Sequence, residues 1–159
     1  IKSPFALHQK STNVFRYSAG SPRDLTLVSA RIGAAKYDVI ISDPYISVNS
    51  SKRLKLLNFL KELKKGGVSY NHLVLRWKPR ESHETLDYQS EQLSNLLKPI
   101  CEGITLKPWD GNGHFHDRRV LLKNVTTERL VTLDVTAGID NLMSANKECA
   151  VFVDEDKNA

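Results

Sequence analysis

The sequence predicts an α/β domain built on a mixed β-sheet with helices on both faces. Segments with helical periodicity alternate with short β-branched segments over the first two thirds of the chain. In the last third, short strand-like segments follow one another, with a brief helix between the final two. Strands joined through helices tend to pair in parallel and adjacent strands in antiparallel fashion, so both pairings are expected in one sheet.

The first predicted helix spans 23–36 and has an apolar stripe made of Leu25, Val28, Ile32 and Ala35. A strand is expected directly afterwards, at 37–47. Its run Val39–Ile41 is short, β-branched and uninterrupted, as in a strand covered on both faces. Pro44 is expected to end this strand, because a proline cannot donate a ladder hydrogen bond.

The next helix, at 50–67, has the clearest pattern in the chain. Ser50 or Ser51 is expected to cap its start, and Gly66 is expected to supply a left-handed stop. Its leucines form a stripe toward the core, made of Leu56, Leu57, Leu60 and Leu63.

The remaining elements follow from the same patterns. A strand at 71–79 is closed by Pro79, and a long helix at 81–100 turns its leucines toward the core. Short strands are expected at 104–109, 115–122, 129–135 and 148–154, with a brief helix around 139–145.

Length and composition indicate one globular domain over residues 1–159. The chain is 40% hydrophobic and 26% charged, and no apolar run approaches the roughly 20 residues that a membrane-spanning helix needs. Since it begins at Ile1 without a secretory signal, it is expected to be a fragment of a larger protein. Cys101 and Cys149 are far apart and lack metal-ligand spacing, so no disulfide framework, metal or cofactor is expected. Reducing, cytoplasmic surroundings fit this cysteine usage.

The charge balance favours polyanionic partners. Lysine and arginine number 23 against 18 acidic residues, which gives a net charge of +5 and a pI near 9.2. Nucleic acid or an anionic membrane surface would be attracted by this bias. At the exit of the strand 71–79, Arg76, Lys78 and Arg80 alternate with Trp77. This pattern predicts either a basic ledge for stacking nucleic acid or a solvated strand exit whose tryptophan packs inward.

Candidate chemistry begins in the stretch GNGHFHDRRVLL, at 111–122. If this stretch is extended, His114, His116 and Arg118 project from one face. A neutral imidazole can attack phosphorus or transfer a proton, and a guanidinium can hold two phosphate oxygens. The alternative is that the histidines are solvated turn residues and the arginines pair with Asp117 or Glu128.

The residues after this stretch add polar groups at two further positions. Gly138, Asp140 and Asn141 fall at a strand-to-helix turn, where a glycine lets a phosphate approach backbone N–H groups. Asn146 and Glu148 fall at the entrance to the last strand. The alternative is that Asp140 and Asn141 cap the short helix and Glu148 is a surface charge.

Taken together, these segments resemble one half-site of the phospholipase D superfamily. That superfamily carries His-x-Lys, an aspartate five residues after the lysine, Gly-Ser-x-Asn, and Asn-x-Glu. The corresponding stretches are His116-Asp117-Arg118, Gly138-Ile139-Asp140-Asn141 and Asn146-Lys147-Glu148. The earlier segments VIISDPYIS and LVLRW extend the resemblance to about residues 21–155. The variant His-Asp-Arg is similar to that of the phospholipase D-like domains at the C-terminal end of some MIT-domain proteins and of their bacterial relatives.

The resemblance implies a role for each matched residue. His116 would be the nucleophile or the acid, Glu148 would orient a histidine, and Arg118, Asn141, Gly138 and Asn146 would surround the phosphate. His114 is a candidate second acid or base. Because one chain supplies one half-site, the resemblance also implies a homodimer or a partner domain with a second half-site.

Departures from the motifs bear on activity. Arg118 replaces lysine, Lys123 stands where the aspartate belongs, and Ile139 replaces the serine hydroxyl. These changes favour a degenerate domain that binds phosphodiesters, DNA or RNA above all, and contributes to the assembly of a larger protein, for example in bacterial defence. The alternatives are a metal-independent nuclease active as a dimer and a module that recruits a phosphoinositide membrane or a protein.

Overall fold

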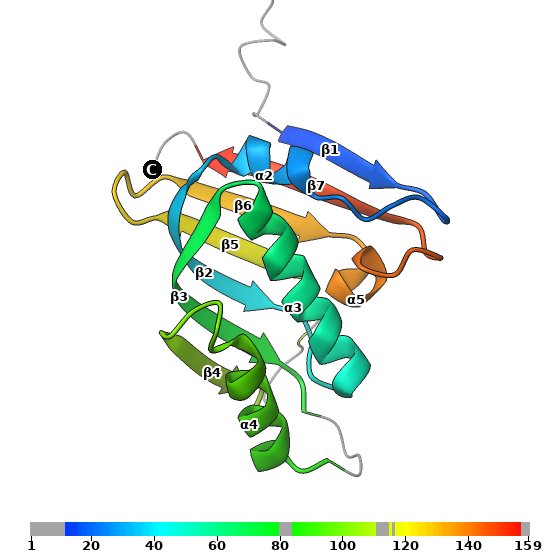
Figure 1. Ribbon diagram of the computed structural model, residues 1–159, viewed down its shortest axis with the longest axis vertical. Helices are drawn as coiled ribbons and strands as arrows, with labels where there is room; N and C mark the ends of the chain where they lie inside the picture. Colours follow the sequence, from blue (N-terminus) through cyan, green and yellow to red (C-terminus); the bar gives the residue numbers. More distant parts are fainter. Residues whose placement is uncertain (1–11, 80–83, 111–114, 116, 157–159) are drawn as a thin grey trace, which may run out of the picture.

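The structure is a computed structural model that describes residues 12–79, 84–110, 115 and 117–156. Seven strands form one sheet in the order β1-β7-β6-β5-β2-β3-β4 (Figure 1). The strands are β1 (Thr12–Tyr17), β2 (Ala35–Ser42), β3 (Val68–Trp77), β4 (Ile104–Pro108), β5 (Arg119–Asn124), β6 (Leu130–Val135) and β7 (Cys149–Asp156). The helices are α2 (Thr26–Ile32), α3 (Ser50–Lys65), α4 (Leu86–Leu97) and α5 (Gly138–Leu142).

The pairing confirms the expected mixed sheet. β2, β3 and β4 run parallel to one another, because α3 and α4 carry the chain back between them. β5 is antiparallel to β2, and β6, β7 and β1 continue the antiparallel half. β1 is a strand that the sequence did not predict. Its six residues TNVFRY are too few for a clear alternating pattern, and its place is set by pairing with β7.

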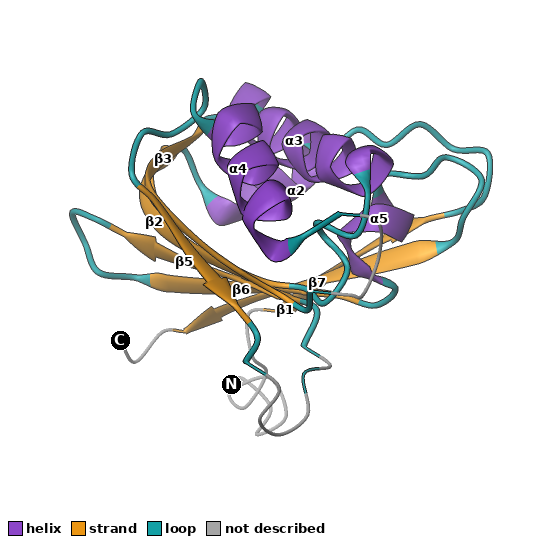
Figure 2. Cartoon of the chain, turned by 90° about the horizontal axis from the view of Figure 1, so that it is seen from below, coloured by secondary structure: helices purple, strands orange, loops and turns teal. Residues whose placement is uncertain are grey.

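The helices do not cover both faces as expected, since α2, α3, α4 and α5 all lie on one face (Figure 2). The strands alternate accordingly. Tyr37, Val39 and Ile41 of β2 are buried toward the helices, whereas Ile40 between them is 38% exposed on the opposite face. The run Val39–Ile41 therefore belongs to a strand covered on one face, and the opposite face is open among the described residues.

The core lies between the sheet and these helices, and the predicted leucine stripe of α3 is part of it. The cap of α3 is Asn49 instead of a serine, since its side chain accepts the N–H of Lys52 at 2.9 Å. α2 is shorter than expected because the chain already enters β2 at Ala35.

Gly66 is needed for close packing rather than for a left-handed turn. Its φ is −85°, while the left-handed conformation falls on Gly67, with φ 108°. A Cβ on Gly66 would lie 2.1 Å from the Cβ of Ser29, which is buried on α2. The hydroxyl of Ser29 donates to the Leu63 carbonyl at 3.1 Å, so the end of α3 is held directly against α2.

We therefore expect Gly66→Ala to lower the free energy of unfolding by about 1–3 kcal/mol, the usual cost of overpacking. Urea denaturation of four proteins, wild type, Gly66→Ala, Ser29→Gly and the double variant, measures this cost and its origin. Because the added methyl group meets Ser29, the loss should be smaller in the Ser29→Gly background. Equal losses in the two backgrounds would contradict the packing explanation.

Candidate functional site

One edge of the sheet brings together segments that are far apart in the sequence. β2, β3 and β4 end at this edge, and β5 begins there, because Arg119 lies opposite Ser42 in antiparallel register. β6 ends there too, with Asp134 opposite Arg119, and α5 follows directly (Figure 1). Side chains just beyond these strand ends lie close together, which is the usual place for ligands in open α/β sheets.

The carboxylate of Asp43 joins two of these segments. It follows β2 directly and is 3% exposed. One carboxylate oxygen accepts the N–H of Tyr45 at 3.0 Å, and the other accepts the N–H of Ile139 at 2.9 Å. A buried carboxylate with two backbone donors is well satisfied, so it fixes the segment after β2 against the first turn of α5.

Gly138 lies in the space between Asp43 and Arg118. Its φ is 85°, and a Cβ there would lie 3.1 Å from Asp43 Oδ2 and 3.6 Å from Arg118 Cδ. Both the backbone conformation and the space therefore require glycine. The next residue, Ile139, packs its side chain into the core, and its N–H is taken by Asp43 instead of being open to an anion.

Arg118 is held by its backbone, and its guanidinium has no carboxylate partner among the described residues. Its carbonyl accepts the N–H of Val135 at 3.0 Å, which continues the β5–β6 pairing. The guanidinium lies over the ring of Tyr45, 5.8 Å from its centre, and reaches the carbonyl of Thr136 at 3.5 Å. These contacts orient the side chain without neutralising its charge.

The neighbouring Arg119 differs from Arg118. Its Nε donates to the carboxylate of Asp134, its register partner on β6, at 3.0 Å. This hydrogen bond, together with the charge of Asp134, raises the pKa of Arg119. Both arginines line one open cavity of about 480 Å³, along with Pro44, Tyr45, Asp117, Asp134, Val135 and Thr136.

A second cation lies near Tyr45 from the helix side. Lys52 on α3 lies 5.8 Å from the centre of the Tyr45 ring and binds Asp140 at 2.7 Å. Lys55 binds the other oxygen of Asp140 at 3.0 Å. Burial raises the pKa of Asp140, but hydrogen bonds and attraction from both lysines outweigh burial and leave that pKa below its ordinary value.

Sequence reasoning missed Tyr45 and Lys52 as members of the site. Lys52 falls within the predicted helix 50–67, and nothing in its spacing indicates a position near β5. The dipeptide Asp43-Pro44 was the available signal, because a carboxylate directly after a buried strand lies at the edge where ligands collect.

The other residues predicted for the site lie at various distances from the cavity. Asn141 is further along α5, and its amide donates to the carbonyl of Ala137 at 2.8 Å. Asn146 is exposed on the segment before β7. Glu148, also exposed, lines a separate hollow that shares Thr136 with the cavity. His114 and His116 lie outside the described residues.

Lys123 lies away from the cavity. It pairs in register with Asp38, toward the other end of β2 from Asp43. Five residues of extended strand separate it from Arg118, a span of about 17 Å. The replacement of the expected aspartate by Lys123 therefore does not alter the charge of the cavity at Arg118.

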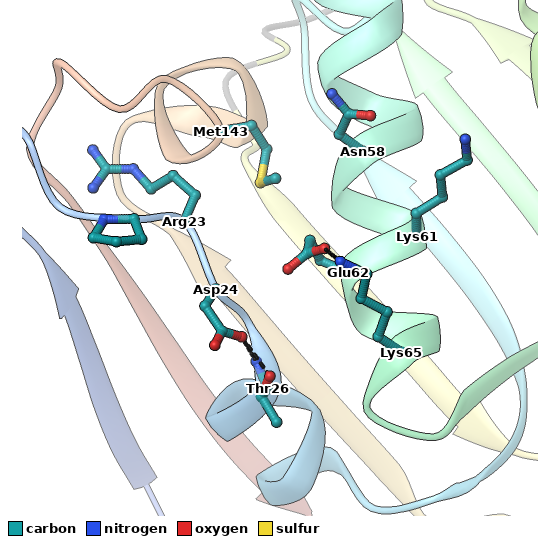
Figure 3. A pocket seen from close by; sticks show the side chains of 9 residues that line it. Arg23, Asp24, Thr26, Asn58, Lys61, Glu62, Lys65 and Met143 are labelled. Atoms are coloured by element: carbon teal, nitrogen blue, oxygen red, sulfur yellow. Dashed lines mark hydrogen bonds and ion pairs between the residues drawn. The ribbon is translucent and has the colours of Figure 1, made fainter.

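A larger groove of about 640 Å³ lies between α3 and the segment leading to α2 (Figure 3). Most of its charged groups already have partners within the chain. Lys65 pairs with Glu62 at 2.7 Å, Asp24 accepts from Thr26, and the guanidinium of Arg23 donates to the carbonyls of Ser18 and Ser144. The groove is therefore a weaker candidate for an anion than the cavity at Arg118.

The described residues contain no group of three or more His, Cys, Asp or Glu side chains placed to hold a metal ion. None of their helices is both long enough and apolar enough to cross a bilayer.

Comparison with solved structures identifies the fold. Nuc from Salmonella typhimurium, a phospholipase D family member, matches with a TM-score of 0.50 and 16% sequence identity, over 93% of this chain and 84% of Nuc. The chain has a phospholipase D-like fold. Polyphosphate kinase from Porphyromonas gingivalis matches with a TM-score of 0.49 and 13% identity, over 91% of this chain and 23% of the kinase. A yeast tyrosyl-DNA phosphodiesterase variant matches with a TM-score of 0.47 and 10% sequence identity, over 90% of this chain and 32% of the phosphodiesterase. No family model and no curated protein sequence matches the chain.

The phospholipase D-like fold confirms the expected α/β class and the resemblance at the level of architecture. At 16% identity the likeness to Nuc is one of fold. The variant motif and the particular relatives expected from the sequence stay predictions.

Asp43→Ala should destabilise the fold at this edge, because it leaves the N–H groups of Tyr45 and Ile139 without their acceptor. An unsatisfied buried donor costs about 1–3 kcal/mol. Asp43→Asn keeps one carbonyl oxygen and should lose less. Chemical denaturation of the two variants provides the measurement, and equal losses would show that the carboxylate is not the connection between the two segments.

The bridge from α3 to Asp140 should make stability depend on acid pH. Because the folded protein lowers the pKa of Asp140, its ion pairs stabilise the fold fully above the ordinary value of 3.8. This stability is lost as pH falls through the lowered folded pKa. The difference in unfolding free energy between wild type and Asp140→Asn should therefore stay constant from about pH 7 to about pH 5 and shrink as the pH falls through about 4 and below.

Asp134→Asn is the matched control for this pH series. It removes the partner of Arg119 in an exposed ion pair, which is worth at most about 1 kcal/mol. A difference for Asp140→Asn that stays constant over the acid range would contradict the role of its charge.

Proposed function

We propose that the domain binds phosphodiesters, in particular nucleic acid, through the cavity at Arg118. The observation that carries the proposal is the guanidinium itself. It lines an open cavity at the ligand edge of the sheet, lies over Tyr45, and has no carboxylate partner among the described residues. A planar guanidinium can form two parallel hydrogen bonds to phosphate oxygens.

The surrounding charge supports an anionic ligand. Lys52 lies on Tyr45 as Arg118 does, and Arg119 lines the same cavity. Asp117 and Asp134 also line the cavity and, with the nearby Asp140, offset part of this charge, but Asp134 and Asp140 are each engaged by cations of the chain. The solved structures with similar folds include a phospholipase D family member and a tyrosyl-DNA phosphodiesterase, whose name states a phosphodiester activity on DNA.

Binding without efficient hydrolysis fits the first turn of α5. Ile139 stands there in place of a serine, so the hydroxyl is absent, and its side chain faces the core. The N–H of Ile139 is used by Asp43, so it does not stabilise charge on a phosphate. These two features favour a domain that holds a phosphodiester and helps to assemble a larger protein. A homodimer or a second phospholipase D-like half-site would complete the cleft.

Arg118→Ala should weaken binding of a fluorescent DNA oligonucleotide about tenfold or more at low salt, as expected for the loss of a charged hydrogen-bond donor. The slope of log affinity against log salt should fall by about 0.7 to 0.9 in magnitude for one lost phosphate contact. Arg118→Lys should keep the slope and lose part of the affinity, because it retains the charge without the planar fork. Fluorescence anisotropy in EDTA measures all three proteins.

Lys61→Ala is the matched control, since Lys61 is an exposed cation of the larger groove on α3. It should leave affinity within about twofold of wild type.

No binding by wild type at low salt would overturn the nucleic-acid proposal, and binding only to phosphoinositide liposomes would replace it. Cleavage that persists in EDTA and disappears in His116→Ala would show a nuclease. Light scattering with and without oligonucleotide tests the dimer.

A further inference from the structure

We propose that the nucleic acid bound at this site is single-stranded and that it stacks a base on Trp109. The inference rests on the proposed function and names the form of nucleic acid that the edge fits. Beyond the Arg118 cavity, the strand ends carry two half-buried aromatic rings with cations on them. We call Lys52, Tyr45, Arg118, Lys78 and Trp109 the cation–aromatic band.

The band has two parts, one at Tyr45 and one at Trp109. Tyr45 carries Lys52 and Arg118, each 5.8 Å from its ring centre, and Lys78 lies 5.0 Å from the ring centre of Trp109. Backbone hydrogen bonds join the two parts. Lys78 N–H donates to Pro44, the neighbour of Tyr45, at 3.0 Å, and Trp109 N–H donates to Trp77 at 2.8 Å.

The length of the band suits a few nucleotides. It extends from β5 across β2 and β3 to the end of β4, which is about 14 Å at the usual spacing between strands. Arg76 adds a further cation on the same edge, where it lies 5.2 Å from the centre of the buried Phe115 ring. A chain of phosphates following this edge would therefore meet cations near the start of β5 and the end of β3.

The aromatic rings distinguish single strands from duplexes. The bases of a duplex stack on one another, whereas an unpaired base can stack on a protein ring while its phosphate contacts a cation. Trp77 cannot serve, because it is 0% exposed and belongs to the core. The sequence suggested a basic ledge at Arg76, Lys78 and Arg80, the last of which lies outside the described residues. In this proposal the aromatic surface of the ledge is Trp109, directly after the adjacent strand β4.

Tryptophan emission gives a direct test, since the chain has two tryptophans and one of them is in the core. Oligothymidylate of about ten nucleotides should quench the emission of the wild type on binding. Trp109→Phe should bind with nearly unchanged affinity and show no quenching. Trp109→Ala should bind the single strand about tenfold more weakly with an unchanged salt slope, because it loses stacking and no charge.

The lysine of the band has its own readout. Lys78→Ala should reduce the salt slope for the single strand by about 0.7, as one phosphate contact is lost. Tyr88→Ala is the matched aromatic control, because Tyr88 is 45% exposed on α4 and is not part of the band. It should change neither affinity nor quenching. A thermal unfolding scan of each variant confirms that it folds.

Three outcomes would overturn the inference. They are equal affinity of wild type for a duplex and a single strand of the same length, quenching that survives in Trp109→Phe, and an unchanged salt slope in Lys78→Ala. Each of these can occur while Arg118→Ala still abolishes binding, in which case the proposed function stands without the band. Absence of any binding by wild type would remove both.

Discussion

The buried carboxylate of Asp43 is the contact on which the geometry of the edge depends. It satisfies two backbone N–H groups that come from segments almost a hundred residues apart, the turn after β2 and the first turn of α5. A buried acceptor of this kind is costly to lose, so both segments are held in one relation to each other. Gly138 and Arg118 pack directly against this junction, and the shape of the cavity follows from it.

The same contact limits the chemistry of the site. In a short helix at the end of a strand, free N–H groups offer an anion a natural place. Here the carboxylate of Asp43 accepts the N–H of Ile139, and the side chain of Ile139 packs into the core. The donors that remain for an external phosphate are side chains, above all the guanidinium of Arg118. Such donors suit recognition through charge, whereas stabilisation of a transition state relies on donors fixed in advance.

Net charge is a poor guide to where such a ligand would bind. Many of the basic residues are engaged within the chain. Lys52 and Lys55 hold Asp140, Arg119 holds Asp134, and the nearly buried Arg53 holds Glu84 at 2.7 Å. The pairs of Lys52, Lys55 and Arg53 connect α3 to its neighbours, and the pair of Arg119 connects β5 to β6. The charge that matters for recognition is the small part left at the strand ends, where aromatic rings orient the cations without neutralising them.

The sequence by itself determined the α/β class, the mixed sheet, the long helices α3 and α4, and the placing of Gly138 at a strand-to-helix turn. These features are carried by local signals, namely periodicity, caps, glycines and prolines, which do not depend on distant parts of the chain. Tertiary structure alone decided that all described helices share one face, that β1 joins β7, and that Tyr45, Lys52 and Arg118 meet. Tertiary structure also made Asp43 the acceptor of the Ile139 N–H in the first turn of α5. Each of these depends on contacts between residues that are distant in sequence, and neither periodicity nor spacing records which distant residues will be neighbours.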